Sequence, residues 1–113
     1  MNDCLFCKII AGDIPSTKVY EDEWVCAFLD IDPQAPFHAV IVPKIHVVSA
    51  AEITAENSHY ISKIFEAVAK IASQEKLEDG FRVVNNCGKD GGQTVGHIHF
   101  HLLARRNLQW PPG

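Results

Sequence analysis

The sequence lacks the features that mark membrane-spanning, nucleic-acid-binding and secreted proteins. None of its apolar runs approaches the roughly 18 residues of a membrane span. Its net charge is -4, whereas nucleic-acid-binding domains are usually basic. Residues 1–8 contain neither the basic region nor the long apolar region of a signal peptide. We therefore expect a cytoplasmic protein with neither membrane nor nucleic acid as a partner.

Internal repeats, linkers and low-complexity tracts are also missing. The chain of 113 residues has the length of one domain, and 47% of its residues are apolar while 21% are charged. That balance is typical of a globular protein. A chain of this length can build a core without crosslinks, which domains below roughly 70–80 residues usually need. The sequence predicts a single domain over residues 1–113.

Apolar periodicity predicts two helices. Residues 4–11 suit a short helix, with Asp3 as N-cap and Gly12 as the stop. Residues 55–75 carry apolar side chains at i, i+3, i+4 and i+7, with Thr54 placed to cap them. One stripe of this long helix should face the core.

The other apolar segments predict strands. They are residues 19–20, 24–29, 38–42, 81–85 and 95–104, and the first two read as a hairpin. Residues 30–36 contain two prolines and residues 88–92 are rich in glycine, so both are expected to be loops. Most strands follow one another closely, which favours an α+β fold: an antiparallel sheet with one long helix on one face and a short N-terminal helix.

The four cysteines are ambiguous by themselves. Cys4 and Cys7 form a CxxC, which is half of a zinc site or a redox pair. A thioredoxin-like redox pair follows a strand, and only three residues precede Cys4. Cys26 and Cys87 lie in apolar, strand-like stretches, where we expect ordinary buried thiols.

Three histidines, His97, His99 and His101, alternate with apolar residues. The period of two puts all three on one face of a strand and the apolar residues on the other. Three interpretations stay open: a solvated polar face, a catalytic zinc site built on His-x-His, and imidazole acting as nucleophile and proton carrier. The glycine-rich loop just upstream suits a phosphate, since its backbone N–H groups can cradle the anion. That placement favours the third interpretation.

The segment from His97 to Leu103 reads His-Ile-His-Phe-His-Leu-Leu and resembles the signature of the histidine triad family. Further segments resemble its nucleotide-binding branch: residues 6–10, 27–31, 33–36, 42–44, 91–94 and 110–113. The resemblance covers nearly the whole chain. It implies a homodimer whose sheet extends across the interface.

The resemblance also implies a reaction. The branch hydrolyses purine nucleoside 5′-phosphoramidates, such as AMP joined to an amine, at the α-phosphorus through a nucleotidyl-histidine intermediate. By match to the signature, His99 is the nucleophile. We expect His101 to contact the phosphate and assist proton transfer to the leaving amine. His38 would orient His99 or the phosphate; its alternative is a core histidine.

The same resemblance implies a set of nucleotide contacts. Asp30 and Ile31 would bind the ribose, Phe6, Ile9 and Val40 would line the base, and Phe28 would join them or serve the core alone. The phosphate would meet Asn86, Gly92, Gln93 and Thr94, with Asn85 as the alternative to Asn86. Trp110 would reach the partner's site in the dimer.

For cofactors, the resemblance implies no organic group but a structural zinc ion on Cys4, Cys7, His46 and His97. Two thiolates and two imidazoles form a closed tetrahedral site. The alternatives are two buried thiols, an exposed His46, and a His97 that only supports His99.

Other functions remain open from the sequence. One is hydrolysis of dinucleoside polyphosphates, for which Arg105 and Arg106 leave room, although the tail 110–113 favours phosphoramidates. Another is a nucleotide-binding scaffold, which would not need the nucleophile. The last is a zinc hydrolase with His97 and His99 as ligands.

Overall fold

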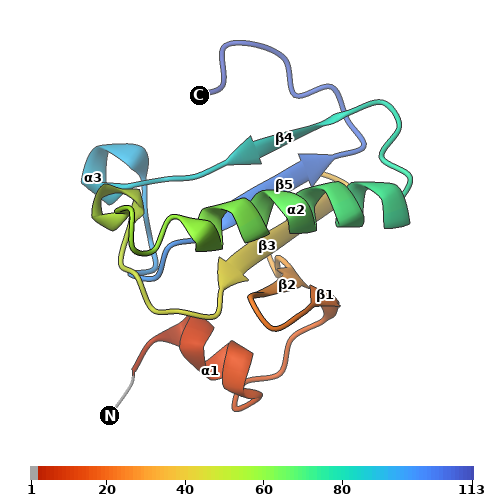
Figure 1. Ribbon diagram of the computed structural model, residues 1–113. Coiled ribbons are helices and arrows are strands. Elements are labelled where there is room, and N and C mark those ends of the chain that lie inside the picture. Colours follow the sequence, from red (N-terminus) through yellow and green to blue (C-terminus); the bar gives the residue numbers. More distant parts are fainter. Residues whose placement is uncertain (1–2) are drawn as a thin grey trace.

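The computed structural model describes residues 3–113 (Figure 1). Its elements are α1 (Leu5–Ala11), β1 (Lys18–Glu21), β2 (Val25–Leu29), β3 (Phe37–Pro43), the 3-10 helix η1 (Ala50–Glu52), α2 (His59–Gln74), β4 (Phe81–Val84), α3 (Gly88–Gly91) and β5 (Phe100–Ala104). The strands form one antiparallel sheet in the order β1-β2-β3-β5-β4. This confirms the predicted α+β fold, including the hairpin of β1 and β2.

The two faces of the sheet are covered by different helices. Helix α2 runs across one face, while α1 lies apart from it at one end of the molecule (Figure 1). Alternate residues of β2, β3 and β5 pack under α2, which contributes Ile64, Val68 and Ile71 to this larger cluster. Phe6 and Ile9 of α1 pack in a smaller cluster on side chains of β2 and β3 that point the other way. The period of two therefore separates the main core from the face that carries the histidines.

Both predicted N-caps were wrong. Helix α1 begins after Cys4 rather than Asp3, and the Cys4 thiol accepts the N–H of Cys7 at 3.4 Å. Gly12 ends α1 in the left-handed conformation, as predicted, since a residue without a Cβ adopts it at low cost. Thr54 caps only a turn, where its hydroxyl accepts the N–H of Glu56 at 3.3 Å. The helix proper begins at His59, four residues beyond the predicted start.

Two further predictions need correction near the histidines. The strand predicted over residues 95–104 is paired only from Phe100 onward. Although β3 continues to Pro43, the chain before Phe100 does not pair with it and bonds to a loop instead: the N–H of Ile98 donates to the Val47 carbonyl at 2.7 Å. The predicted glycine loop contains a single helical turn, α3, ended by Gly92 in the left-handed conformation. The alternation nevertheless holds, since Ile98 and Phe100 face the core under α2.

In the described part of the chain, residues 3–113, no helix combines the length and the apolar character that crossing a bilayer would require.

Candidate active site

A cavity of about 740 Å³ opens on the sheet face opposite α2. Apolar side chains line most of it, from α1, from the segment before β1 and from the centre of the sheet. Its polar wall brings together Asp30, Thr94, His99 and His101. Phe28, Val40 and His101 stand side by side on adjacent strands, because the register pairs Phe28 with Val40 and Val40 with His101. An apolar pocket with a few convergent polar groups is the usual form of a small-molecule site.

The backbone holds the middle histidine in one tautomer. His99 is buried, and its Nδ1 lies 2.8 Å from the carbonyl oxygen of His97. A carbonyl only accepts, so Nδ1 carries the proton, and in the neutral ring Nε2 keeps a lone pair. The Asn85 side chain donates to the His99 carbonyl at 2.9 Å and fixes the backbone at this point. The ring of Phe6 packs edge-on against the His99 imidazole, with centroids 4.9 Å apart.

A second chain of hydrogen bonds fixes the third histidine. The Gln34 N–H donates to His38 Nδ1 at 3.0 Å, so the proton of His38 lies on Nε2. That Nε2 is 2.8 Å from His101 Nδ1 and 3.4 Å from a carboxylate oxygen of Asp30. His101 Nδ1 therefore accepts, which leaves Nε2–H as the donor on the His101 ring. His38 therefore orients His101, a contact that the sequence did not suggest, while its role toward His99 or the phosphate stays a prediction.

Burial keeps these rings neutral. Burial, followed by the neighbouring imidazoles of His99 and His38, lowers the pKa of His101 to about 4. Burial also lowers the pKa of His38, although the Asp30 carboxylate opposes the shift. Charged forms lose hydration in such a site, so the uncharged imidazoles are favoured near neutral pH.

His97, the first of the three histidines, faces a cluster of metal-binding residues and not the cavity. His97 Nε2 donates to the Pro43 carbonyl at 3.1 Å, which leaves Nδ1 with its lone pair. That atom lies 3.4 Å from the Cys4 sulfur and 3.5 Å from the Cys7 sulfur. His46 Nδ1 lies 3.4 Å from the Cys7 sulfur.

The ligand atoms of Cys4, Cys7, His46 and His97 all lie within 4.8 Å of one another. Two sulfur and two imidazole ligands are the donor set of a structural zinc site, and closing them on one ion needs only small movements. The Pro43 carbonyl holds His97 in the tautomer that a metal requires, as partners of metal-bound histidines commonly do. The four residues named from the sequence therefore fit zinc.

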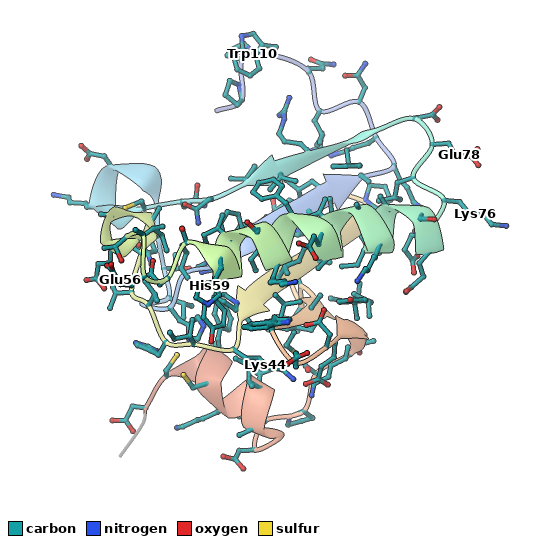
Figure 2. All side chains as sticks on the ribbon, viewed as in Figure 1. Lys44, Glu56, His59, Lys76, Glu78 and Trp110 are labelled. Atoms are coloured by element: carbon teal, nitrogen blue, oxygen red, sulfur yellow. The ribbon has the colours of Figure 1, made fainter. Side chains whose placement is uncertain are left out.

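The other predicted contacts divide into two groups. Phe6, Ile9, Asp30, Ile31, Val40 and Thr94 line the cavity, as does Phe28, which also belongs to the smaller apolar cluster. Gln93 does not line it: its amide N–H groups donate to the carbonyls of Val48 and Val95, and its oxygen accepts the Gly88 N–H. Asn86 and Gly92 do not line it either. Trp110 is 80% exposed and stands at the end of the molecule away from α1 (Figure 2).

The sequence reasoning missed two contributors. Asn85 was named only as an alternative phosphate contact, yet its amide holds the backbone of His99. Gln34 acts through its backbone N–H, which no side-chain pattern can reveal.

Cys87 was expected to be buried but is half-exposed, and a hydrogen bond from the Ser49 hydroxyl lowers its pKa.

Comparisons with known proteins agree with this geometry. The family model described as "HIT domain" matches residues 11–108. The chain is 45% identical to the purine nucleoside phosphoramidase of Escherichia coli K12, over 94% of this chain and 90% of that protein. It is 51% identical to a 14 kDa zinc-binding protein of Zea mays, over 96% of this chain and 87% of the relative. A crystal structure of a HIT family hydrolase from Legionella pneumophila superposes with a TM-score of 0.95 at 46% identity, covering 98% of this chain and all of that one.

The sheet, the histidine row and the cavity, together with these relatives, indicate a histidine-based hydrolase. The chain belongs to the HIT family.

Proposed function

We propose that this protein hydrolyses purine nucleoside 5′-phosphoramidates at the α-phosphorus through a nucleotidyl-histidine intermediate. The observation that carries the proposal is the pair of rings at the cavity: His99 has Nε2 available as a nucleophile, and His101 has Nε2–H available as a donor. The name of the Escherichia coli relative supports the substrate class. A cytoplasmic location belongs to the proposal, since that compartment keeps the CxxC thiols reduced.

In the first step, His99 Nε2 attacks the phosphorus, a phosphorus–nitrogen bond forms to the ring, and the bond to the amine breaks. The amine leaves with a proton taken from solvent. In the second step, water attacks the nucleotidyl-histidine, releases the nucleoside monophosphate and returns a proton. Two exchanges at phosphorus replace one difficult displacement. The bond from His99 Nδ1–H to the His97 carbonyl supports the imidazolium formed in the intermediate.

We assign His101 the hydrogen bond to a phosphate oxygen, with Nε2–H as donor. Its pKa of about 4 means that it rests as a neutral ring. A neutral imidazole is too weak an acid to protonate the amine outright, which changes the role suggested by the sequence. The hydrogen bond stabilises charge that grows on the phosphate oxygens in the transition state.

The cavity also suits the rest of a nucleoside. Asp30 accepts hydrogen bonds, and its carboxylate can take both ribose hydroxyls. Phe6 and Phe28 pack at 5.6 Å between centroids and offer aromatic surface to a purine. Ile31 is fully exposed at the mouth, where a ribose would cover it.

Turnover of adenosine 5′-phosphoramidate tests the proposal. We expect the native protein to release AMP and His99→Ala to bind AMP without turnover. His59→Ala is the matched control, because His59 is an exposed histidine on α2, the helix that packs on the face of the sheet opposite the cavity. Native protein that binds AMP but releases none from this substrate would contradict the proposal.

The alternatives predict other results. A zinc hydrolase using His97 and His99 would lose turnover in chelator at saturating substrate. We do not favour it, because the His97 lone pair faces the cysteines rather than the cavity. Hydrolysis of dinucleoside polyphosphates would use Arg105 and Arg106 to bind the additional phosphates. Arg105 already donates to the Glu75 carbonyl and Arg106 to the Gln34 carbonyl, so the two arginines lend this alternative little support.

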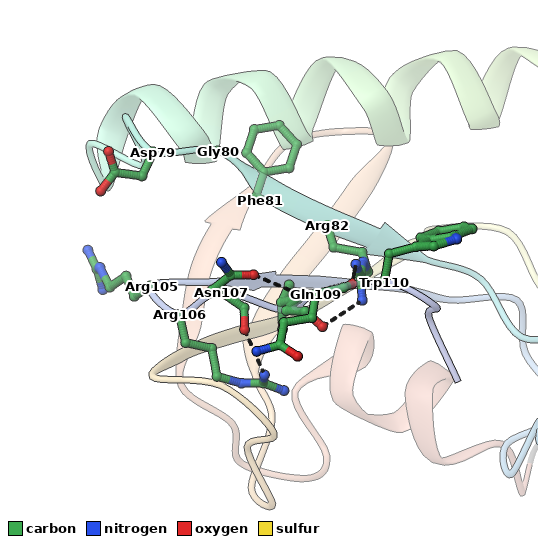
Figure 3. Close-up of a pocket in the computed structure, with 10 residues that line it drawn as sticks. Asp79, Gly80, Phe81, Arg82, Arg105, Arg106, Asn107, Gln109 and Trp110 are labelled. Carbon is green, nitrogen blue, oxygen red and sulfur yellow. Dashed lines mark hydrogen bonds between the residues drawn. The ribbon is translucent and has the colours of Figure 1, made fainter.

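A homodimer with a continuous sheet is part of the proposal. Within residues 3–113, β4 pairs with β5 and its other edge has no strand. Beside β4 the C-terminal tail forms a second cavity of about 910 Å³, which contains the exposed Phe81 and Trp110 (Figure 3). An open edge with nearby apolar side chains favours pairing with a second copy. Sedimentation velocity at micromolar concentration should give twice the mass of 12.5 kDa.

The proposal includes a structural zinc ion on Cys4, Cys7, His46 and His97. When bound, the ion would crosslink α1 to the loop after β3 and to the segment before β5. It takes no part in the steps above. The printed name of the Zea mays relative supports the metal.

A further inference from the structure

We propose that the cluster formed by Cys4, Cys7, His46 and His97, here called the metal clasp, is coupled to the nucleotide cavity through helix α1. Metal binding and nucleotide binding then strengthen each other. This inference rests on the proposed function, because it takes the occupant of the cavity to be a nucleotide.

Helix α1 contributes to both places. Cys4 and Cys7 belong to the metal clasp, whereas Leu5, Phe6 and Ile9 line the cavity. The helix has seven residues, and an isolated helix of that length is marginal in water. Its position therefore depends on its attachments, which are the small apolar cluster beneath it and the contacts of its thiols with the two histidines.

Phe6 is the point where the two places meet. Its ring centroid lies 6.0 Å from that of His97 in the metal clasp and 4.9 Å from that of His99 in the cavity. It also packs on Phe28, at 5.6 Å, to form the base-binding wall. Because Phe6 stands between the two cysteines in sequence, a metal that positions both thiols also positions this ring.

His97 provides a second connection. Its Nδ1 faces the thiols, while its backbone carbonyl accepts the proton of His99 Nδ1. A metal bound to this imidazole restrains the residue whose carbonyl orients the nucleophilic ring. Both connections pass through atoms that are in contact, so no long pathway is needed.

The consequence is a reciprocal change in affinity. Metal and nucleotide both favour the arrangement in which α1 is docked, and linkage requires each to raise the affinity of the other by the same factor. We expect a factor of about ten, within the range common for coupled sites. The base should carry most of the effect, because in the proposed complex the base lies against Phe6.

Zinc affinity with and without nucleotide tests the coupling. We would titrate the protein with zinc against a chromogenic chelator, alone, with saturating AMP and with ribose 5-phosphate. AMP should lower the zinc Kd about tenfold. Ribose 5-phosphate has the phosphate but no base, so it keeps only the connection through His97 and should lower the Kd much less than AMP. It also controls for zinc binding to phosphate. Calorimetry of AMP binding should give the same factor between zinc-loaded and chelator-treated protein.

Two variants sharpen the test. Cys4→Ser/Cys7→Ser should abolish the zinc effect on AMP affinity, whereas Cys87→Ser, a thiol outside the metal clasp, should retain it. An equal zinc Kd with and without AMP, in protein that binds both, would overturn the coupling and leave the proposed function standing. Failure to bind zinc would overturn the coupling alone, and failure to bind AMP would overturn both.

Discussion

His101 should make the folded protein sensitive to mild acid, and asparagine in its place should reduce that sensitivity. Burial, reinforced by the neighbouring rings, lowers the pKa of His101 from 6.5 to about 4. In the unfolded chain the ring returns to its ordinary pKa. Between these two values the unfolded chain binds more protons than the folded one, so the free energy of unfolding falls as the pH drops.

The two pKa values set the size of the effect. The contribution of His101 is nearly complete at pH 7, and about 2 kcal/mol of it is lost by pH 5. The ring is only partly buried and water screens its surroundings, so we expect about 1–2 kcal/mol in practice. The loss continues until the pH reaches about 4, where the folded ring also takes up its proton.

Urea unfolding at pH 7 and pH 5, for the native protein and His101→Asn, measures this contribution. The asparagine carbonyl can still accept from His38 Nε2, so the variant keeps the hydrogen bond while losing the titration. Titrating groups that are not in contact with His101 are shared by the two proteins, so their effects cancel in the comparison. The stability lost between the two pH values should be about 1–2 kcal/mol smaller in the variant. Equal losses in both proteins would refute the assignment of a partly buried, neutral His101.

Three further predictions follow from the packing and hydrogen bonds. Asn85→Ala removes the donor to the His99 carbonyl and should lower kcat by about tenfold, measured by AMP release, while AMP binding by calorimetry changes little. Ile71→Ala empties a fully buried position under α2 and should lower the free energy of unfolding by about 2–5 kcal/mol in urea; KM should stay unchanged, and a raised KM would show that the two faces of the sheet are not independent. Chelator should lower the Tm of the native protein in a thermal scan but not that of Cys4→Ser/Cys7→Ser, whereas equal shifts in both would argue against the metal clasp.

Local patterns in the sequence were sufficient to predict which segments form helices and which form strands, for most of the elements. Alternation in residues 95–104 predicted which side chains face the core, because the two faces of an extended chain differ whether or not it is paired. Pairing itself was overestimated, since the chain before Phe100 does not pair with β3 and bonds to the Val47 carbonyl in a loop instead. The caps were missed because a thiol can replace Asp3 as the acceptor, and because Thr54 satisfies a local turn instead of the helix.

The sequence by itself determined the chemistry that is available: three histidines on one face, a CxxC pair, and the resemblance to the histidine triad family. The roles of the individual rings were decided only by the tertiary structure, because a tautomer depends on what lies opposite each nitrogen. His97 meets Cys4 across 93 positions of sequence, and His38 meets His101 across 63. Such contacts depend on the order of strands in the sheet and on the docking of α1, and no local pattern encodes either.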